Sequence, residues 1–302
     1  MIKDDSSQWL YCSLIVIFTC VVNTAWAGGK SVFYDGEITF GFDDNLSKAQ
    51  RERDIVEDHF GEASLAVAYH TVFSGKAAMT VKGFLSGEAF ETVDSLNRAS
   101  AGAEVSFRWQ PSLGFLDPIY KLSLTAQVDE YDVDQRDSDV AKVQLATTKR
   151  ITDRLTATLG GEYRYRDSDG SVFDTEDYRF FLNGDLMVTK TLALYSTYSY
   201  LYGDVTSTAQ VQFCNGLVAD DIYSLLKAST AIEVDEAFNE HFCGSWVSYR
   251  LDGQTNAVTV GLNQGFGQNY ALDVSALWAS VRGDLNNDYY RRIYRATFLV
   301  RF

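Results

Sequence analysis

Charged side chains at alternating positions are the residues of this 302-residue chain with the clearest potential for chemistry. In a β-strand successive side chains point to opposite faces, so these charges share a polar face and apolar residues share the other. The acidic set is Glu37, Glu62, Glu104, Glu162, Asp185 and Asp273, and the basic set is Lys82, Lys121, Arg108, Arg164, Arg166, Arg179, Arg295 and Arg301. If the strands close into a tube, both sets line its interior. Rings of such charges can set the selectivity of a pore, whereas charges paired across the interior would fill it as a polar core.

Both interpretations of the polar face stay open at the level of sequence. The residues that we select as candidates for lining or selectivity are Arg108, Glu162, Arg164, Arg166, Arg179, Asp185 and Arg295.

The sequence contains less evidence for a catalytic site than for a charged lumen. Of the three histidines, His241 is the one that stands near a candidate nucleophile, Ser245. A serine hydrolase needs a base that is held against the nucleophile and oriented by a third group. On a strand, a spacing of four leaves both side chains on one face and too far apart to touch. We therefore expect no enzyme activity, and a hydrolase at the mouth of the tube is the least favoured hypothesis.

No cofactor and no metal site are expected, because the sequence has neither C-x-x-C nor the Cys/His spacing of zinc or haem sites. Cys214 and Cys243 would be the only thiols after removal of a secretory leader. In an oxidising compartment such an even pair favours a disulfide, with two unpaired buried thiols as the alternative.

The elements that must position these residues are strands. Alternation of apolar and polar residues predicts twelve of them, separated by turns, which is the signature of an antiparallel up-and-down transmembrane β-barrel. The expected strands lie at 34–42, 62–70, 79–85, 103–109, 121–129, 139–149, 155–166, 178–186, 192–202, 257–265, 270–282 and 289–302. The stretch 243–251 also alternates, so fourteen strands remain an alternative if 211–217 pairs with it.

The lengths of the connections orient the barrel. The short links 74–76, 150–154 and 189–190 should face the periplasm, and the long, mostly acidic links 43–58, 132–138, 167–175 and 203–241 should face outside. In the longest link, Asp220 and Asp221 precede apolar residues at helical spacing, which predicts a short helix. The acidic loops could hold cations that bridge lipopolysaccharide, although no loop shows ordered calcium-ligand spacing.

The last strand, Tyr289 to Phe302, carries an apolar, aromatic face and a cationic face. It resembles the C-terminal signal strand by which bacterial outer-membrane barrels are recognised for assembly. The resemblance implies the barrel-assembly machinery as a partner, contacted through Tyr294, Phe298, Val300 and Phe302.

The N-terminus reads as a cleaved signal peptide, residues 1–27, with an apolar run before the A-x-A site that ends at Ala27. The remaining residues, 28–302, form one barrel domain that we place in the outer membrane, with its lipid and lipopolysaccharide as neighbours. A formal charge of −15 argues against nucleic acid as a partner.

Gly41-Phe-Asp-Asp-Asn45, directly after the first expected strand, resembles the opening element of the β-barrel porin type of outer-membrane protein. Similar openings occur in barrels associated with exopolysaccharide export and in surface-lipoprotein assembly modifiers. The resemblance implies a porin-like channel for small polar or anionic solutes, or for saccharides in export. The alternative is a closed binding barrel whose long acidic loops contact envelope polysaccharide or a secreted partner.

Overall fold

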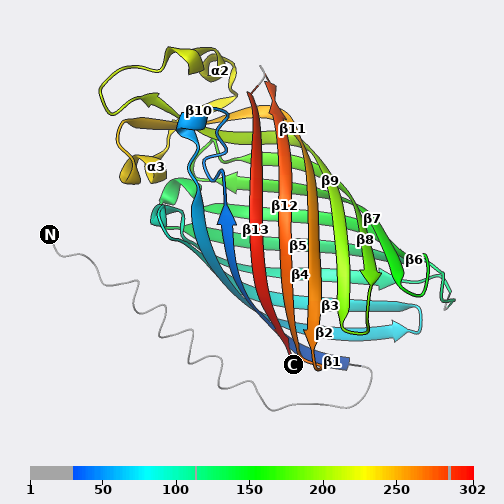
Figure 1. Ribbon diagram of the computed structural model, residues 1–302. Helices are drawn as coiled ribbons and strands as arrows, with labels where there is room; N and C mark the ends of the chain where they lie inside the picture. The colour runs from blue at the N-terminus through cyan, green and yellow to red at the C-terminus, as the bar shows by residue number, and fades with distance from the viewer. Residues whose placement is uncertain (1–29, 113, 285–286) are drawn as a thin grey trace, which may run out of the picture.

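The computed structural model describes residues 30–112, 114–284 and 287–302, so the expected signal peptide lies outside the described residues. Twelve antiparallel strands form a closed ring in chain order, and pairing of β9 with β11 completes it (Figure 1). The expected twelve-stranded barrel is confirmed, and the fourteen-stranded alternative is wrong. A thirteenth strand, β10, lies outside the ring. In the part of the chain that the structure describes, no helix is long and apolar enough to cross a membrane.

The ring consists of β1 (Lys30–Asp43), β2 (Asp58–Ser74), β3 (Ala77–Phe90), β4 (Arg98–Trp109), β5 (Ile119–Tyr131), β6 (Ser138–Arg150), β7 (Leu155–Ser168), β8 (Thr175–Met187), β9 (Leu192–Gln212), β11 (Ser245–Phe266), β12 (Tyr270–Gly283) and β13 (Asn287–Arg301). The other elements are β10 (Ala231–Val234), α2 (Tyr223–Ala228), α3 (Glu236–His241), η1 (Glu52–Asp54), η2 (Asp94–Leu96), η3 (Asp134–Arg136) and η4 (Asp220–Ile222).

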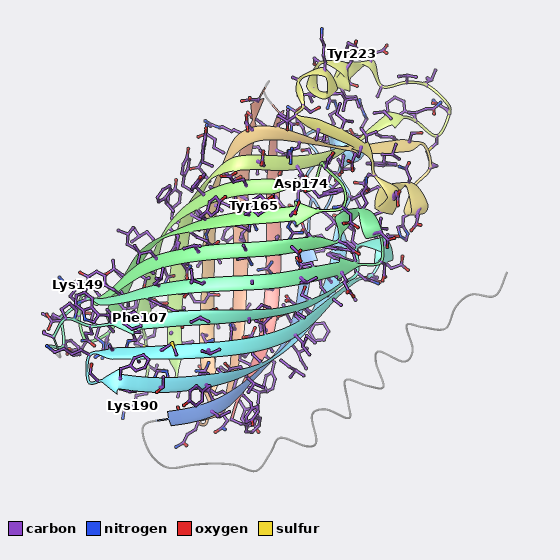
Figure 2. All side chains as sticks on the ribbon, turned by 180° about the vertical axis from the view of Figure 1, so that it is seen from behind. Phe107, Lys149, Tyr165, Asp174, Lys190 and Tyr223 are labelled. Carbon is purple, nitrogen blue, oxygen red and sulfur yellow. A yellow bond between two sulfur atoms is a disulfide. The ribbon has the colours of Figure 1, made fainter. Side chains whose placement is uncertain are left out.

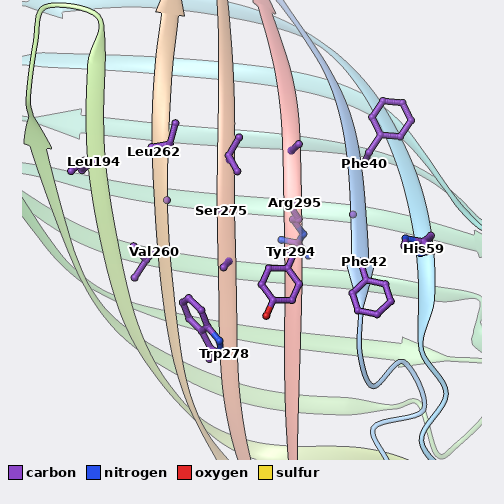
Figure 3. Close-up of a pocket in the computed structure, with 15 residues that line it drawn as sticks. Phe40, Phe42, His59, Leu194, Val260, Leu262, Ser275, Trp278, Tyr294 and Arg295 are labelled. Atoms are coloured by element: carbon purple, nitrogen blue, oxygen red, sulfur yellow. The ribbon is translucent and has the colours of Figure 1, made fainter.

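The outer wall of the ring is apolar. Leu145, Leu159 and Phe180 keep 60, 57 and 59% of their surface exposed. Such exposure repeated around a ring exceeds the apolar patches of soluble proteins and fits contact with lipid. On the wall formed by β9, β11, β12, β13 and β1, the rings of Phe42, Trp278 and Tyr294 stand around a shallow hollow (Figure 3).

The two ends of the barrel differ as expected from the connections. Figure 2 places Lys149, near the end of β6, and Lys190, in the short link between β8 and β9, at one end, and Asp174 and Tyr223 at the other. By the rule that short turns are periplasmic, the end with Asp174 and Tyr223 is the outer mouth.

Two strands continue beyond the ring at the outer mouth. β9 pairs with β8 only as far as Gly203, and β11 pairs with β12 from Gly253 onward. Gly203, Gly253 and Gly283 are cross-strand neighbours at this rim. Gly203 has φ +141°, and a Cβ there would collide with the carbonyl oxygen of Glu176. Glycine therefore permits the β9–β11 hairpin to leave the wall at this point.

Two sequence-based boundaries are corrected by this hairpin. Residues 243–251 do not form a separate strand, since 245 onward is the outer half of β11. Residues 203–212 are not loop but the outer half of β9. The expected short helix is present as η4 and α2, and α3 is an additional helix in the same link.

The outer halves of β9 and β11 and everything between them, residues 204–252, form a folded cap over the mouth (Figure 1). In a ring of twelve strands, the β3–β4 loop lies opposite this hairpin, yet α3 contacts η2 of that loop. One apolar cluster joins the cap to the outer loops of the facing wall: Leu46, Val56, Val93, Leu96, Val133, Ala237, Phe238 and Trp246. The cap therefore spans the mouth and docks on the other side.

A second apolar cluster stabilises the cap itself. It packs η4 and α2 against the hairpin through Ala209, Ala219, Ile222, Leu225, Tyr249 and Leu251. The expected disulfide joins Cys214 to Cys243 across the base of the link, with a sequence separation of 29. In the chain-entropy description, closing a loop of this length stabilises the folded cap by about 3–4 kcal/mol.

Candidate functional site

A cavity of about 400 Å³ lies within the ring, between its wall and the cap. Its lining comes from the first outer loop (residues 44–57), the cap and the outer halves of strands on both sides of the ring. Five cations line it: Lys48, Arg136, Arg164, Arg166 and Arg291. We call this space the upper cavity.

Two of these arginines belong to β7 and are paired with carboxylates in the wall. Arg164 donates from Nε and Nη2 to Asp177 Oδ2, at 2.7 and 2.6 Å. Arg166 Nη2 lies 3.1 Å from Asp129 Oδ2, and Asp129 is fully buried. Buried carboxylates of this kind are costly without a partner. Their pairing with arginine orients both guanidinium groups along the cavity.

The other two arginines have partners at the outer rim. Arg136 Nη2 lies 2.7 Å from Asp235 Oδ2 in the cap. Arg291 Nε lies 2.9 and 3.0 Å from the two oxygens of Asp43 at the end of β1. All four arginines of the upper cavity are therefore charge-compensated.

Lys48 is the exception. Its Nζ donates to Thr206 Oγ1 at 3.1 Å, and no ion pair with a carboxylate involves it in the part of the chain that the structure describes. Burial, reinforced by Arg291 and the other arginines of the cavity, lowers the pKa of Lys48 to about 7. Lys48 is thus a cation of the upper cavity that has no negative partner.

The backbone holds Lys48 in a costly conformation. Its φ is +55°, in the left-handed region, which costs a non-glycine residue about 1 kcal/mol or more. The contacts that fix it come from the cap and the wall. Ser207 Oγ donates to the Lys48 carbonyl at 2.6 Å, and Thr208 N donates to the Ser47 carbonyl at 3.0 Å. Asn45 Nδ2 donates to the Tyr290 carbonyl at 2.9 Å.

The lowered pKa of Lys48 makes docking of the first outer loop depend on pH. In the docked loop Lys48 loses its proton near pH 7, whereas an undocked lysine keeps it to about 10.5. The undocked state therefore binds more protons in this window, and docking gains stability as the pH rises through it. Hydrogen exchange at the Thr208 and Ala49 amides, corrected for intrinsic rates, should show protection rising from pH 7 to 10. Lys48→Met should abolish this rise; an equal rise in both proteins would contradict the assignment.

A second cavity, of about 480 Å³, occupies the lumen nearer the periplasmic end. Its charged lining is Asp35, Glu37, Glu62, Glu104, Glu162, Lys82, Arg98 and Lys142. Many of these charges are paired: Arg98 Nη2 lies 3.0 Å from Glu88, and Glu104 is 3.5 and 3.3 Å from Lys82 and Lys121. Glu162, a candidate from the sequence, lies here and not with Arg164 and Arg166.

The remaining sequence candidates face the lumen outside both groups of charge. Arg179 Nε donates to Ser199 Oγ at 3.2 Å and its guanidinium stacks over Phe181. Arg295 lies over the ring of Phe60. Asp185 accepts from Asn183 Nδ2 at 2.6 Å. Arg108 lies next to the last residue of β4. Its cross-strand neighbours are Lys121 on β5 and Ala78 on β3. The structure therefore brings Arg164 and Arg166 together, places Glu162 directly opposite Arg179 on β8, and leaves Arg108, Asp185 and Arg295 apart.

His241 does not meet Ser245. Ser245 lies beside Gln212, with 3.5 Å between its Oγ and Gln212 Oε1, whereas His241 Nε2 lies 3.0 Å from Ser95 Oγ and 3.0 Å from Asp94 Oδ1. The serine and the carboxylate approach the same ring nitrogen, so the carboxylate is not placed on Nδ1 to orient the ring as in a hydrolase triad. Ser95 is buried, and its hydroxyl donates a hydrogen bond to the carboxylate of Glu240. These contacts fasten α3 to η2.

The sequence did not reveal Lys48, Arg136 or Asp235 as site residues. They lie in links between strands, where alternation gives no information about direction. Arg291, in contrast, lies on the cationic face that alternation predicts for the last strand. Among the described residues, no group of three or more His, Cys, Asp or Glu side chains is arranged to hold a metal ion.

No protein-family model matches the chain, and no curated protein matches it by sequence. Among solved structures, the chain is similar to the COG4313 outer-membrane channel from Pseudomonas putida F1, with a TM-score of 0.58 and 11% identity over 93% of this chain and 98% of that one. It is more distantly similar to the NanC porin, with a TM-score of 0.44 and 9% identity over 88% and 98% of the two chains.

At such identities the likeness concerns the fold alone. The likeness to the COG4313 channel agrees with the closed ring described above. The chain has the fold of a bacterial outer-membrane β-barrel.

Proposed function

We propose that this protein is a gated outer-membrane channel for small anionic solutes, with the cap as its gate. The observation that carries the proposal is the upper cavity, where five cations converge and Lys48 has no carboxylate partner. Because aspartates compensate the four arginines, the uncompensated charge is that of protonated Lys48, and inside a low-dielectric wall this charge attracts an anion. The proposed role of Lys48 is to offer an entering anion its first direct contact.

The unfilled lumen supports a channel over a purely structural barrel. Two cavities, of about 400 and 480 Å³, lie within the ring. The lower one is lined by five carboxylates and three cations, and Lys82 and Arg98 pair with carboxylates, so it opposes anions less than its carboxylates alone would. We therefore assign the preference for anions to the upper cavity.

The way in which the cap is attached to the ring supports a role as a gate. The cap is attached to the ring through one hairpin at the glycine rim, and it rests on the other loops mainly through side-chain contacts, together with the backbone hydrogen bond from Thr208 N to the Ser47 carbonyl. Gln135 Nε2 and Ser171 Oγ, from two outer loops, donate to Glu233 of the cap at 3.0 and 2.6 Å. Such contacts can break without loss of any hydrogen bond of the wall.

Reversal potentials in planar bilayers under a potassium chloride gradient test this proposal. The wild-type protein should open in bursts, and the open state should prefer chloride. Lys48→Met should lower the preference for chloride, while Lys149→Met, at the periplasmic end, should leave it unchanged. Cation-preferring currents, or the same preference in all three proteins, would refute the assignment of the upper cavity. Absence of any current from a correctly folded protein would refute the channel itself.

A binding barrel is the second candidate, and it is favoured by the outer surface of the cap. Leu217, Val218 and Tyr223 expose 63, 66 and 71% of their surface there. Apolar residues gathered on a solvent-facing cap suit contact with a macromolecule such as envelope polysaccharide or a secreted partner. Replacing all three by Ser should abolish retention of purified polysaccharide on immobilised protein; unchanged retention would count against this candidate.

A further inference from the structure

The upper cavity has two chemically different walls. The side formed by β5, β7 and β8 carries Arg164, Arg166 and their carboxylates. The side formed by β9, β11, β12 and β13 is mainly apolar. Its apolar members are Leu201, Val205, Ala257, Leu277, Ala279, Val281 and Ile293, and its polar members include Thr255, Tyr289 and Arg291, which is paired with Asp43. Interior positions of outer-membrane barrels are usually polar. Seven apolar residues gathered on one side of the lumen are therefore unusual.

The strand register brings most of these apolar residues together, with Arg291 opposite Ala279 as the charged exception. Leu277 lies opposite Ile293, Val281 opposite Tyr289, and Ala257 opposite Ala279. These positions alternate with outward residues such as Trp278, which faces lipid. Both faces of these strands are thus mostly apolar at this height, and on the inner face Ala257, Val281 and Ile293 are buried while Leu277 and Ala279 are partly exposed. The inner face lines the cavity.

We propose that the upper cavity binds an amphipathic monoanion, an aromatic or short aliphatic carboxylate, with its charged group at Lys48 and its apolar body on the wall around Leu277 and Ile293. This inference rests on the proposed function, because it names the class of solute that the same site takes. The four arginines already have aspartate partners. One uncommitted cation remains, so one negative charge completes the site.

Other solutes match this cavity less well. A small inorganic anion would satisfy Lys48 but leave the apolar wall in contact with water. A neutral apolar molecule would cover the wall but displace water from Lys48 without replacing its hydrogen bonds. A carboxylate with an apolar body does both, by a charge-assisted hydrogen bond to Nζ and by burial of its body. A cavity of about 400 Å³ is of the size of small-molecule sites.

Fluorine NMR on the full-length protein in lipid nanodiscs can separate these classes with three matched probes. They are 4-fluorobenzoate, fluoroacetate (the anion without the ring) and 4-fluorobenzyl alcohol (the ring without the charge). Below pH 7 Lys48 keeps its proton. In this pH range the wild-type protein should bind 4-fluorobenzoate at least about tenfold more tightly than either of the other probes. This comparison needs no variant. Equal affinity for fluoroacetate, or for the alcohol, would overturn the proposal.

Variants then locate the two contacts. Lys48→Met should weaken 4-fluorobenzoate about tenfold and leave the alcohol unchanged, while Leu277→Asn should weaken both aromatic probes. Matched controls are Lys149→Met and Leu299→Asn, which alter a lysine and a lumen-facing leucine nearer the periplasmic end. Variants that weaken no probe would refute the assigned contacts.

The outcomes also separate this inference from the channel proposal. Anion-preferring currents without a preference for 4-fluorobenzoate would leave the channel standing and refute the amphipathic solute. Binding that depends on Lys48 and Leu277, without any current, would sustain the site and refute the channel.

Discussion

Deleting residues 215–240 should convert brief channel openings into a steady conductance that is several times larger. The deletion removes η4, α2 and β10 and most of α3, which supply Ile222 and Leu225 to one apolar cluster and Ala237 and Phe238 to the other. Without them the hairpin of β9 and β11 keeps Trp246 and its hydrogen bonds to the first outer loop but loses most of the contacts that hold it across the mouth. The ring itself should persist, because its wall pairing ends at Gly203 and Gly253, below the deletion.

Two measurements make this deletion interpretable. The shift in electrophoretic mobility on heating reports the folded barrel and should be the same in both proteins. Replacement of Cys214 and Cys243 by Ser keeps the cap but releases its base, and should lengthen the openings without making them permanent. A folded deletion variant with the wild-type conductance would show that the cap is not the gate.

The ring could be predicted from sequence because lipid imposes a strict rule on it. Each outward position of a spanning strand must be apolar and each inward position can be polar, so alternation marks strand and direction together. Register then follows for residues such as Thr39 and Thr297, which face the lumen opposite each other and share a 2.9 Å hydrogen bond. Arg164 and Arg166 were found in this way.

Of the cap, the short helix and the disulfide were predicted, but the outer halves of β9 and β11 were not, because that rule ends at the membrane surface. Beyond Gly203, protein covers both faces of β9. On one face Ala209 packs in the apolar cluster with η4 and α2, and on the opposite face Thr208 Oγ1 donates a hydrogen bond to Asp235. Alternation is lost, and the stretch reads as a polar loop. Lys48 illustrates the same limit, since its direction depends on tertiary contacts with Thr206 and Ser207 that no local pattern encodes.

Asp235→Ala should undock the cap while leaving the barrel folded. Asp235 is fully buried and Oδ2 accepts from Arg136 Nη2, Thr208 Oγ1 and Ser248 Oγ at 2.7, 3.1 and 2.6 Å. Its Oδ1 also accepts from Phe238 N at 3.3 Å and so caps α3. Removing it leaves a partly buried guanidinium and two hydroxyls without their acceptor, which should cost about 3–5 kcal/mol of docking free energy.

A matched control distinguishes this buried contact from a surface one. Asp221 also joins the cap to the first outer loop, through Arg51 and Arg53, and these two side chains lower its pKa to about 2. Its side chain is 49% exposed, however, and water and salt replace such partners at little cost. Asp221→Ala should therefore change docking by less than about 1 kcal/mol. Hydrogen exchange across 204–252 measures both variants. Equal effects would mean that the cap is held by its apolar clusters and that the Asp235 network adds no net stability, which is a known outcome for buried ion pairs whose desolvation offsets their attraction.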